Sequence, residues 1–378
     1  MLNARLDFLK GATSRRRLRI RPLALVAILV LLPFISEGQT QADSGGLDIR
    51  QVAALIEQVR ANPSDAAKVA EARAVGFELL RAARYAAAVE VFDAIVDGVP
   101  ADGVALYGGA LALFNLQRLE EAERVAREAV RACIAATSVP SAKLSGGAVD
   151  AKEQASEALT LLGVILAVKG DNAGALSAVT KAAALAPRNF DAQFALGRAL
   201  FGMGNPAGAA RVFSAAVALR PNDVKARFFL ATSLETTGDY EKALTVYREL
   251  LALSPASAEG HLGLGVLLVK LGGEKMNEGV AELARAVALN GDLYEARITI
   301  GRALVQLGRV AEAVEHLQRA AQLAPRNPEP HYQLALAYRR LGKITEAAEE
   351  NTLTQKLHSE RRGAGDNKSP EASSDKPE

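Results

Sequence analysis

The 378-residue sequence contains no tryptophan, a single cysteine and only four histidines. One cysteine excludes a disulfide bond within the chain, and Cys133 is expected to be a small buried hydrophobic side chain, with a bridge between two chains as the alternative. No two histidines or cysteines have the spacing of a metal site, so His261 and His331 are expected to pack between helices. The sequence therefore predicts no bound metal.

Motifs of catalysis and cofactor binding are missing as well. Gly263-Leu264-Gly265 lacks the third glycine of a dinucleotide fingerprint, and no Walker loop is present. The sequence has no G-x-S-x-G motif, and neighbouring carboxylates such as Glu120 and Glu121 are expected on solvated helix faces. We therefore expect no catalytic residue, no cofactor and no enzymatic activity.

Positive charge is scarce outside the N-terminus. Residues 1–42 contain seven basic and two acidic residues, and the remaining sequence contains 38 basic and 41 acidic residues, a net charge of −3. A protein without a basic excess lacks the electrostatic footprint of nucleic-acid binding, so nucleic acid is not an expected partner.

Residues 1–42 have the layout of an export signal. Basic residues end at Arg21, an apolar run extends from Leu23 to Ile35, and small residues follow. The run is shorter than the roughly 20 residues of a membrane-spanning helix. We expect a cleaved signal peptide of bacterial type and a periplasmic or secreted protein. The alternative is an uncleaved anchor that holds the remaining chain outside the inner membrane.

What the sequence has in abundance is a 34-residue period. Leucine and proline, two residues apart, recur at Leu185, Leu219 and Leu253 with Pro187, Pro221 and Pro255. Glycines keep the same interval, with a two-residue insertion before the last two: Gly170, Gly204, Gly238, Gly272, Gly308 and Gly342. A period of this length is typical of helical repeat arrays, in which each repeat buries its apolar face against its neighbours.

Each repeat has the residues of two helices. Large residues at positions 7 and 11 share one face of the first helix. A small residue at position 8 and alanines at positions 20 and 27 allow close packing of the second helix. Glycine at position 15 ends the first helix, and proline at position 32 ends the second. Asp171, Asn205 and Asp239 are expected to cap second helices.

This pattern resembles the tetratricopeptide repeat, W-x2-L-G-x2-Y followed by A-x3-F, A and P. One repeat reads Leu230-Ala231, Leu234, Gly238, Ala243, Tyr247, Leu250 and Pro255. The tryptophan of position 4 is replaced in every repeat. The resemblance implies an all-α fold, a right-handed superhelical solenoid of antiparallel helix pairs.

The register gives eight repeats, which begin at Val69, Gly103, Ser156, Phe190, Val224, Ala258, Tyr294 and Pro328. Residues 43–68 are predicted to form a linker and a cap helix with an apolar stripe of Val52, Leu55, Ile56 and Val59. Residues 69–136 contain repeats one and two, residues 137–155 an interrupting loop, residues 156–361 repeats three to eight, and residues 362–378 a disordered tail.

In tetratricopeptide repeats, positions 2, 5, 9, 12 and 13 of the first helices line a concave groove. The resemblance therefore implies a partner-binding groove that includes Tyr107, Phe114, Phe194, Arg198, Phe201, Phe228, Arg302, Tyr332 and Arg339. Aromatic residues are typical anchors of peptide-binding surfaces, although the same rings would also suit a core. No repeat combines lysine at position 5 with asparagine at position 9, so a clamp for a terminal carboxylate is not expected.

The expected function is a non-catalytic scaffold or adaptor that binds a segment of a protein in this groove. The sequence leaves two alternatives open. The protein would be a structural assembly element of a cell-envelope complex, which the interruption and Cys133 suggest, or an accessory module of a glycan-handling or secretion enzyme system.

Overall fold

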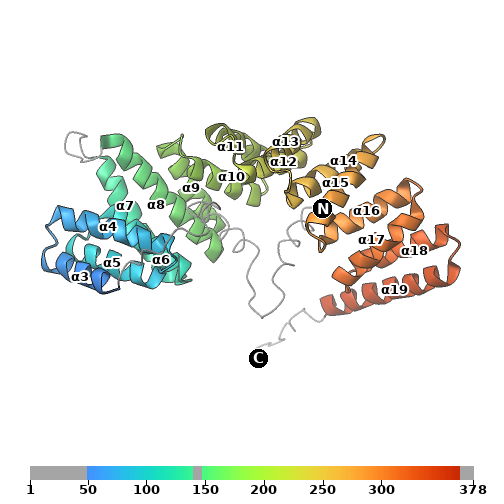
Figure 1. Cartoon of the computed structure of the whole chain (residues 1–378), viewed down its shortest axis with the longest axis horizontal. Helices are drawn as coiled ribbons and strands as arrows, with labels where there is room; N and C mark the ends of the chain where they lie inside the picture. The colour runs from blue at the N-terminus through green and yellow to red at the C-terminus, as the bar shows by residue number, and fades with distance from the viewer. Residues whose placement is uncertain (1–48, 139–146, 367–378) are drawn as a thin grey trace, which may run out of the picture. The chain divides into compact units, whose positions relative to one another are not determined.

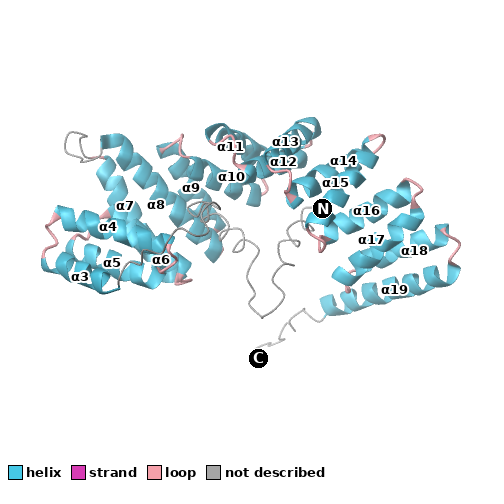
Figure 2. Ribbon diagram, in the orientation of Figure 1, coloured by secondary structure: helices cyan, strands magenta, loops and turns pink. Residues whose placement is uncertain are grey.

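The computed structural model describes residues 49–138 and 147–366, in which the secondary structure consists of helices joined by short loops (Figures 1 and 2). The leading helix is α3 (Ile49–Ala61). The helix pairs that follow are α4 (Ala66–Arg81) and α5 (Tyr85–Gly98), α6 (Gly103–Asn115) and α7 (Leu119–Thr137), α8 (Gly147–Lys169) and α9 (Asn172–Leu185), α10 (Phe190–Gly202) and α11 (Pro206–Leu219), α12 (Val224–Thr237) and α13 (Tyr240–Leu253), α14 (Ala258–Leu271) and α15 (Lys275–Leu289), α16 (Tyr294–Gln306) and α17 (Val310–Leu323), and α18 (Pro328–Arg340) and α19 (Ile344–Asp366). The fold is an all-α solenoid of helix pairs.

The helix pairs follow the predicted repeats closely. Helices α6, α10, α12, α14, α16 and α18 begin at the predicted first residues of their repeats. The predicted stripe of the leading helix, Val52, Leu55, Ile56 and Val59, is the set of residues that α3 buries. The predicted export signal lies outside the described residues, and no helix within them is long and apolar enough to cross a membrane.

The interrupting loop predicted for residues 137–155 is wrong in its second half. Helix α8 begins at Gly147, nine residues before the predicted start of repeat three at Ser156. Ala151 and Ala155 are buried at 4% and 0% exposure, and Ala155 packs with Ala158 against a cluster that contains Cys133. The added turns therefore extend the buried face of α8 towards repeat two. Residues 139–146 lie outside the described residues.

The predicted boundary of the C-terminal tail at residue 362 is also wrong. Helix α19 continues to Asp366, five residues past the predicted end of repeat eight at residue 361. The part of α19 that packs against α18 includes Thr354 and Leu357, each 7% exposed. Residues 367–378 lie outside the described residues.

The turn inside each repeat needs one residue with a left-handed backbone. Glycine occupies this position in repeats three to eight, with φ between 72° and 90°. In repeats one and two the same position is Ala83, with φ 56°, and Gln117, with φ 62°. A left-handed conformation costs a residue with a Cβ about 1–2 kcal/mol, so the helix packing of these two repeats stabilises an unfavourable turn.

Two of the three predicted caps of second helices are confirmed. The side chains of Asp171 and Asn205 accept hydrogen bonds of 2.8 and 2.9 Å from backbone N–H groups of their helices. The prediction for Asp239 is wrong, because its carboxylate lies 3.5 Å from the Lys242 ammonium and makes no cap hydrogen bond. Capping side chains also precede several first helices, at Asp65, Asp102, Asn189, Asp223, Ser257 and Asn327.

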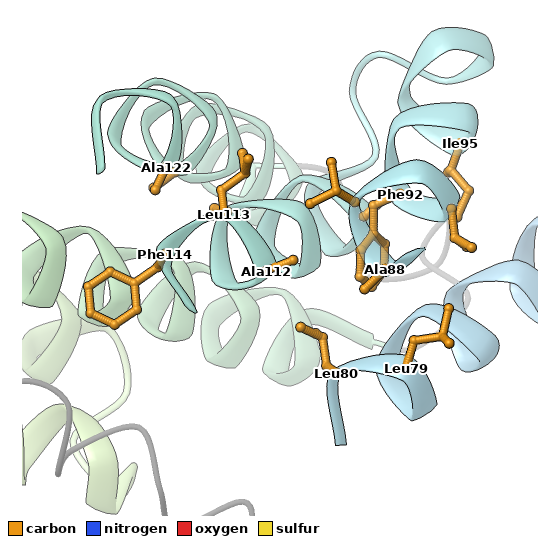
Figure 3. Packing of buried hydrophobic residues seen from close by; sticks show 14 of the residues in the cluster. Leu79, Leu80, Ala88, Phe92, Ile95, Ala112, Leu113, Phe114 and Ala122 are labelled. Carbon is orange, nitrogen blue, oxygen red and sulfur yellow. The ribbon is translucent and has the colours of Figure 1, made fainter. Parts of the chain in front are cut away.

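The small residue at position 8 sets the distance between the two helices of a repeat. A Cβ atom added at Gly197 would lie 2.7 Å from the Phe213 ring, and one added at Gly76 would lie 2.6 Å from the Phe92 ring. Both phenylalanines occupy position 24. Phe92 is 1% exposed and lies close to Ala88 and Ile95 in the core (Figure 3). The second helix therefore inserts a large side chain where the first helix has none.

The chain divides into two compact bodies, an N-terminal body that ends at Ser233 and a C-terminal body that begins at Leu234. Within each body, a first helix packs against the second helix of its repeat and against the first helix of the next repeat. Examples of the latter are α8 with α10 in the N-terminal body and α16 with α18 in the C-terminal body. Neighbouring first helices therefore present one shared surface in each body.

The close packing at position 8 yields a stability prediction. A Cβ atom at Gly265 would lie 2.9 Å from the Gly279 carbonyl oxygen, and backbone atoms cannot rotate away. We expect Gly265→Ala to destabilise the protein by about 1–3 kcal/mol, although alanine favours helix more than glycine. Gly291→Ala is the matched control, since nothing lies within 4 Å of its added Cβ. Equal midpoints of urea unfolding for the two variants would contradict this packing.

Candidate functional site

Six of the nine predicted groove residues lie on first helices of the N-terminal body. Tyr107, Arg198, Phe201 and Phe228 are partly exposed there. Tyr107 lies beside Phe77, with ring centroids 6.5 Å apart, and burial together with the carboxylates of Glu157 and Asp191 raises its pKa. These four side chains are therefore partly accessible on the first helices.

The other two belong to the core, which corrects their assignment to the groove. Phe114 is 2% exposed and Phe194 is 7% exposed. The Phe114 ring lies at the end of α6, on the side away from Phe92 (Figure 3). The Phe194 ring packs edge-to-face on Phe213, with centroids 5.7 Å apart, so position 5 of α10 points between the helices of its repeat. Repeat position alone did not distinguish these rings from their exposed neighbours.

An aromatic cluster joins α10, α11 and α12. Phe194 contacts Phe190 and Phe229 at centroid distances of 5.7 and 5.6 Å, and Phe213 stacks on Phe229 at 5.4 Å. Phe228 lies at the edge of this cluster, 5.8 Å from Phe229. Rings packed in this way hold one another in place, so Phe228 presents a partly exposed face on a rigid base.

Charged groups flank the aromatic cluster. The Arg198 guanidinium lies 5.8 Å from the centre of the Phe229 ring, and the Arg220 guanidinium lies 4.1 Å from the centre of the Phe190 ring. Arg220 also forms an ion pair of 3.2 Å with Asp191. Burial raises the pKa of Asp191, an effect that the nearby Arg220 opposes. Burial lowers the pKa of Arg198 to about 9.

A small cavity opens beside Arg198 where α8, α9 and α10 meet. Its volume is about 70 Å³, and small side chains such as Ala167, Ala195 and Ala199 form most of its wall. Met203, which is 51% exposed, lies at its edge. The cavity is therefore apolar, and one arginine contributes to its lining.

The remaining predicted groove residues lie on the C-terminal body. Arg302 on α16 lies 3.8 Å from Glu329 on α18, an ion pair whose side chains are about half exposed. Tyr332 is 48% exposed, and Arg339 is exposed about two helical turns further along α18. This surface is more polar than the aromatic cluster of the N-terminal body.

Two histidine–carboxylate pairs, each with a buried histidine, are a feature that the sequence analysis missed. His261 Nδ1 lies 2.6 Å from a Glu282 carboxylate oxygen, and His331 Nδ1 lies 2.6 Å from a Glu350 oxygen. Both pairs join position 4 to position 23 of a repeat. In repeats one to three the same positions are apolar: Ala72 and Val91, Leu106 and Val125, Leu159 and Ala178. Both repeats that have histidine at position 4 have glutamate at position 23, and this coincidence in the sequence could have predicted the pairs.

Position 4 also contacts the turn that precedes its helix. Gln193 Nε2 donates to the Pro187 carbonyl oxygen at 3.1 Å, and Arg297 Nε donates to the Gly291 carbonyl oxygen at 3.3 Å. His261 Nε2 lies 2.9 Å from the Pro255 carbonyl oxygen. Polar residues in place of the family's tryptophan thus tie the first helix to the turn between repeats. Because both ring nitrogens of His261 face oxygen acceptors, both contacts are hydrogen bonds only if the ring or Glu282 carries an additional proton.

Cys133 is buried, with 3% exposure, as the sequence predicted. Burial raises the pKa of its thiol to about 11, and the Asp102 and Glu157 carboxylates act in the same direction. The thiol is therefore neutral and poorly reactive at physiological pH. Among the residues that the structure describes, no group of three or more histidine, cysteine, aspartate or glutamate side chains is placed to hold a metal ion.

The stacked helix pairs of this protein place it in the class of helical-repeat proteins. Family models described as tetratricopeptide repeats match residues 77–137 and 194–258 and, for a second model, residues 301–349. The chain belongs to the tetratricopeptide-repeat family. No curated protein matches the sequence. Repeats of this family support a role as a protein-interaction scaffold, and their fold is typically non-catalytic.

Several solved structures share the fold. MamA from Desulfovibrio magneticus RS-1 is 22% identical, with 45% of this chain and 96% of that chain covered and a TM-score of 0.43. YrrB, described as a TPR protein with an unusual peptide-binding site, is 21% identical over 48% of this chain and 93% of its own, with a TM-score of 0.42. PilF from Pseudomonas aeruginosa is 18% identical over 55% and 94%, with a TM-score of 0.48.

The His261–Glu282 pair yields a prediction for a double-mutant cycle. His261→Leu removes the ring that contacts the buried Glu282 carboxylate, and Glu282→Val removes the carboxylate that contacts the ring. Apolar residues fill these positions in repeat two, so we expect the double variant to be more stable than the sum of the single variants predicts. The expected coupling in urea unfolding is about 1–3 kcal/mol. Strict additivity would show that the two side chains do not stabilise each other.

Proposed function

We propose that this protein is a non-catalytic scaffold that holds a segment of another protein against α10 and the first turns of α12. The supporting observation is the pair of partly exposed rings, Phe201 and Phe228, beside the aromatic cluster and Arg198. Aromatic and arginine side chains on a rigid base are the residues that most often dominate binding energy at protein interfaces.

The aromatic cluster explains why this surface would bind with little loss of entropy. Phe229 packs against Phe194 and Phe213, so it cannot move freely beneath Phe228. A partner that covers Phe228 would order few additional rotamers of the scaffold, and pre-organisation of this kind favours affinity. The surface of the C-terminal body, with Arg302, Tyr332 and Arg339, would supply polar contacts to the same partner or to a second one.

Two observations count against the alternative role as an assembly element. Cys133 is 3% exposed, so it is poorly placed to bridge two chains. Half of the interruption that suggested a hinge or a docking loop is part of α8. We therefore place the scaffold function first. An accessory role in a glycan-handling or secretion system would be one setting for such a scaffold.

The groove assignment is tested by Phe201→Ser combined with Phe228→Ser. The variant and the unaltered protein are each crosslinked to their partners in the cells that produce them. We expect recovery of crosslinked partner proteins to fall about tenfold or more with the variant, because anchor rings at interfaces typically contribute about 2 kcal/mol or more each. Phe194 is left unchanged, since its ring belongs to the core. Ile134→Ser on α7 is the control, because Ile134 is 42% exposed on a second helix.

Quantitative mass spectrometry of the crosslinked proteins provides the measurement, and circular dichroism checks that both variants keep their helix content. Undiminished recovery with the double variant would place the partner elsewhere. A loss of recovery with Ile134→Ser alone would move the binding surface to the second helices.

We further propose that the protein acts outside the cytoplasm of a bacterial cell. The support is the basic stretch, apolar run and small residues of positions 1–42. Sequencing the N-terminus of the protein isolated from its own cells tests this proposal, and we expect it to begin between about residue 37 and residue 43. A protein that starts at Met1 in a membrane fraction would favour the anchor, and one that starts at Met1 in the cytoplasm would contradict export.

A further inference from the structure

A second cavity, larger than the one beside Arg198, lies on the C-terminal body between the second helices α13 and α15. Its volume is about 470 Å³, within the range of roughly 300–1,000 Å³ that is usual for ligand sites. We call this cavity the α13–α15 pocket. Its lining consists of Arg248 and Leu251 from α13, Glu278, Glu282 and Arg285 from α15, His261 and Leu264 from α14, and Pro255 from the turn between the repeats.

The buried polar side chains of this pocket contact one another. His261 Nδ1 lies 2.6 Å from one oxygen of Glu282, and the other oxygen accepts a hydrogen bond of 2.5 Å from Arg285. His261 Nε2 lies 2.9 Å from the Pro255 carbonyl oxygen. Leu264, which is 3% exposed, adds apolar surface beside them. An occupant therefore meets apolar groups and polar groups that already have partners.

Two arginines line the exposed side of the pocket, one from each second helix. The Arg248 side chain is 54% exposed and pairs with Glu278 at 2.9 Å, and the Arg285 side chain is 63% exposed and pairs with Glu282. Each arginine charge is thus compensated by a carboxylate, so the pocket does not select an anion. A guanidinium makes its hydrogen bonds in its own plane, and its flat faces remain open to stacking on an aromatic ring.

The N-terminal body contains an arginine that makes both kinds of contact at once. Arg220 forms an ion pair of 3.2 Å with Asp191, while its guanidinium lies 4.1 Å from the centre of the Phe190 ring. An aromatic ring in the α13–α15 pocket would make the same contact with Arg248 or Arg285 and leave both ion pairs intact.

Among aromatic side chains, the indole of tryptophan complements the pocket best. Its face attracts cations more strongly than those of tyrosine and phenylalanine, and its N–H is a hydrogen-bond donor. Glu278 is the matching acceptor, because it is 45% exposed and its contact with Arg248 uses one carboxylate oxygen, Oε1. His261 stands at position 4, where the repeat pattern has tryptophan, and the smaller imidazole leaves room beside it.

We infer that the α13–α15 pocket binds a tryptophan side chain of a partner protein. The indole would lie on Leu264 with its face against a guanidinium and its N–H towards Glu278. This chain contains no tryptophan, so the occupant comes from a different protein and not from a second copy of this one. The pocket is a second binding site beyond the proposed function, which concerns the surface around Phe201 and Phe228 on the N-terminal body.

Saturation-transfer difference NMR with the purified full-length protein tests the inference, because this method detects weak ligands. The probe is N-acetyl-tryptophanamide, and N-acetyl-leucinamide is the aliphatic comparison. We expect the indole protons to receive saturation in a saturable way, and the leucine compound to bind about fivefold more weakly or less, since it lacks a ring to stack on the guanidinium groups.

Arg248→Ala combined with Arg285→Ala removes both guanidinium faces from the pocket. Arg309→Ala combined with Arg319→Ala is the matched control, because these two arginines of the same body are exposed and also form ion pairs. We expect the pocket variant to weaken binding of the probe about fivefold or more and the control to leave it within about twofold.

Leu251→Trp is a second pocket variant, which places an indole of the chain itself at the wall of the pocket. We expect it to reduce binding of the probe by blocking the site. Leu353→Trp on α19 is its control, because Leu353 is 37% exposed outside the pocket. Circular dichroism checks that all four variants keep their helix content.

The outcomes separate this inference from the proposed function. Equal binding of the probe to the arginine variant and its control would overturn the inference. Probe binding that is lost only with Phe201→Ser combined with Phe228→Ser would also overturn it, and would support the proposed function instead. No saturable binding of the probe to the unaltered protein would overturn the inference and leave the proposed function standing, since that function does not require tryptophan.

Discussion

The structure depends on the contact between position 8 of each first helix and position 24 of each second helix. Glycine or alanine at position 8 leaves room for a large side chain, as at Gly197 with Phe213 and at Gly265 with Leu283. This contact fixes the separation of the paired helices, and the pairs in turn fix the spacing of neighbouring first helices. The surface that carries Phe201 and Phe228 follows from this packing, together with the contacts of α10 with α8 and α9.

The repeats differ in the type of residue that packs at positions 4 and 23. The first three repeats have apolar pairs there, of which Val125 is only partly buried. Repeat six buries His261 with Glu282, and repeat eight places buried His331 against partly buried Glu350. Replacing a buried polar pair by apolar residues is often neutral or stabilising, so these pairs are better suited to fixing the register of a repeat than to strengthening it. The hydrogen bonds from Gln193, His261 and Arg297 to the preceding turns have the same effect.

Much of the fold could be predicted from the sequence, because the period fixes the register of every repeat. Six first helices begin where the period placed them. The period could not predict the long start of α8, since Ala151 and Ala155 lie outside the repeat and are buried by contacts with repeat two. The site was less predictable. Phe194 and Phe228 share position 5, yet Phe194 is buried among the rings of its neighbours and Phe228 is partly exposed. Only the three-dimensional packing of these rings distinguishes them.

The most direct measurement of the central claim is site-specific photo-crosslinking in the cells that produce the protein. A photoreactive phenylalanine analogue replaces residue 201 on α10 in one variant and residue 134 on α7 in a second variant. The proposed scaffold predicts one dominant partner crosslinked from residue 201 and none from residue 134. Crosslinks from residue 134 alone, or crosslinks from residue 201 only to other copies of the same chain, would contradict it.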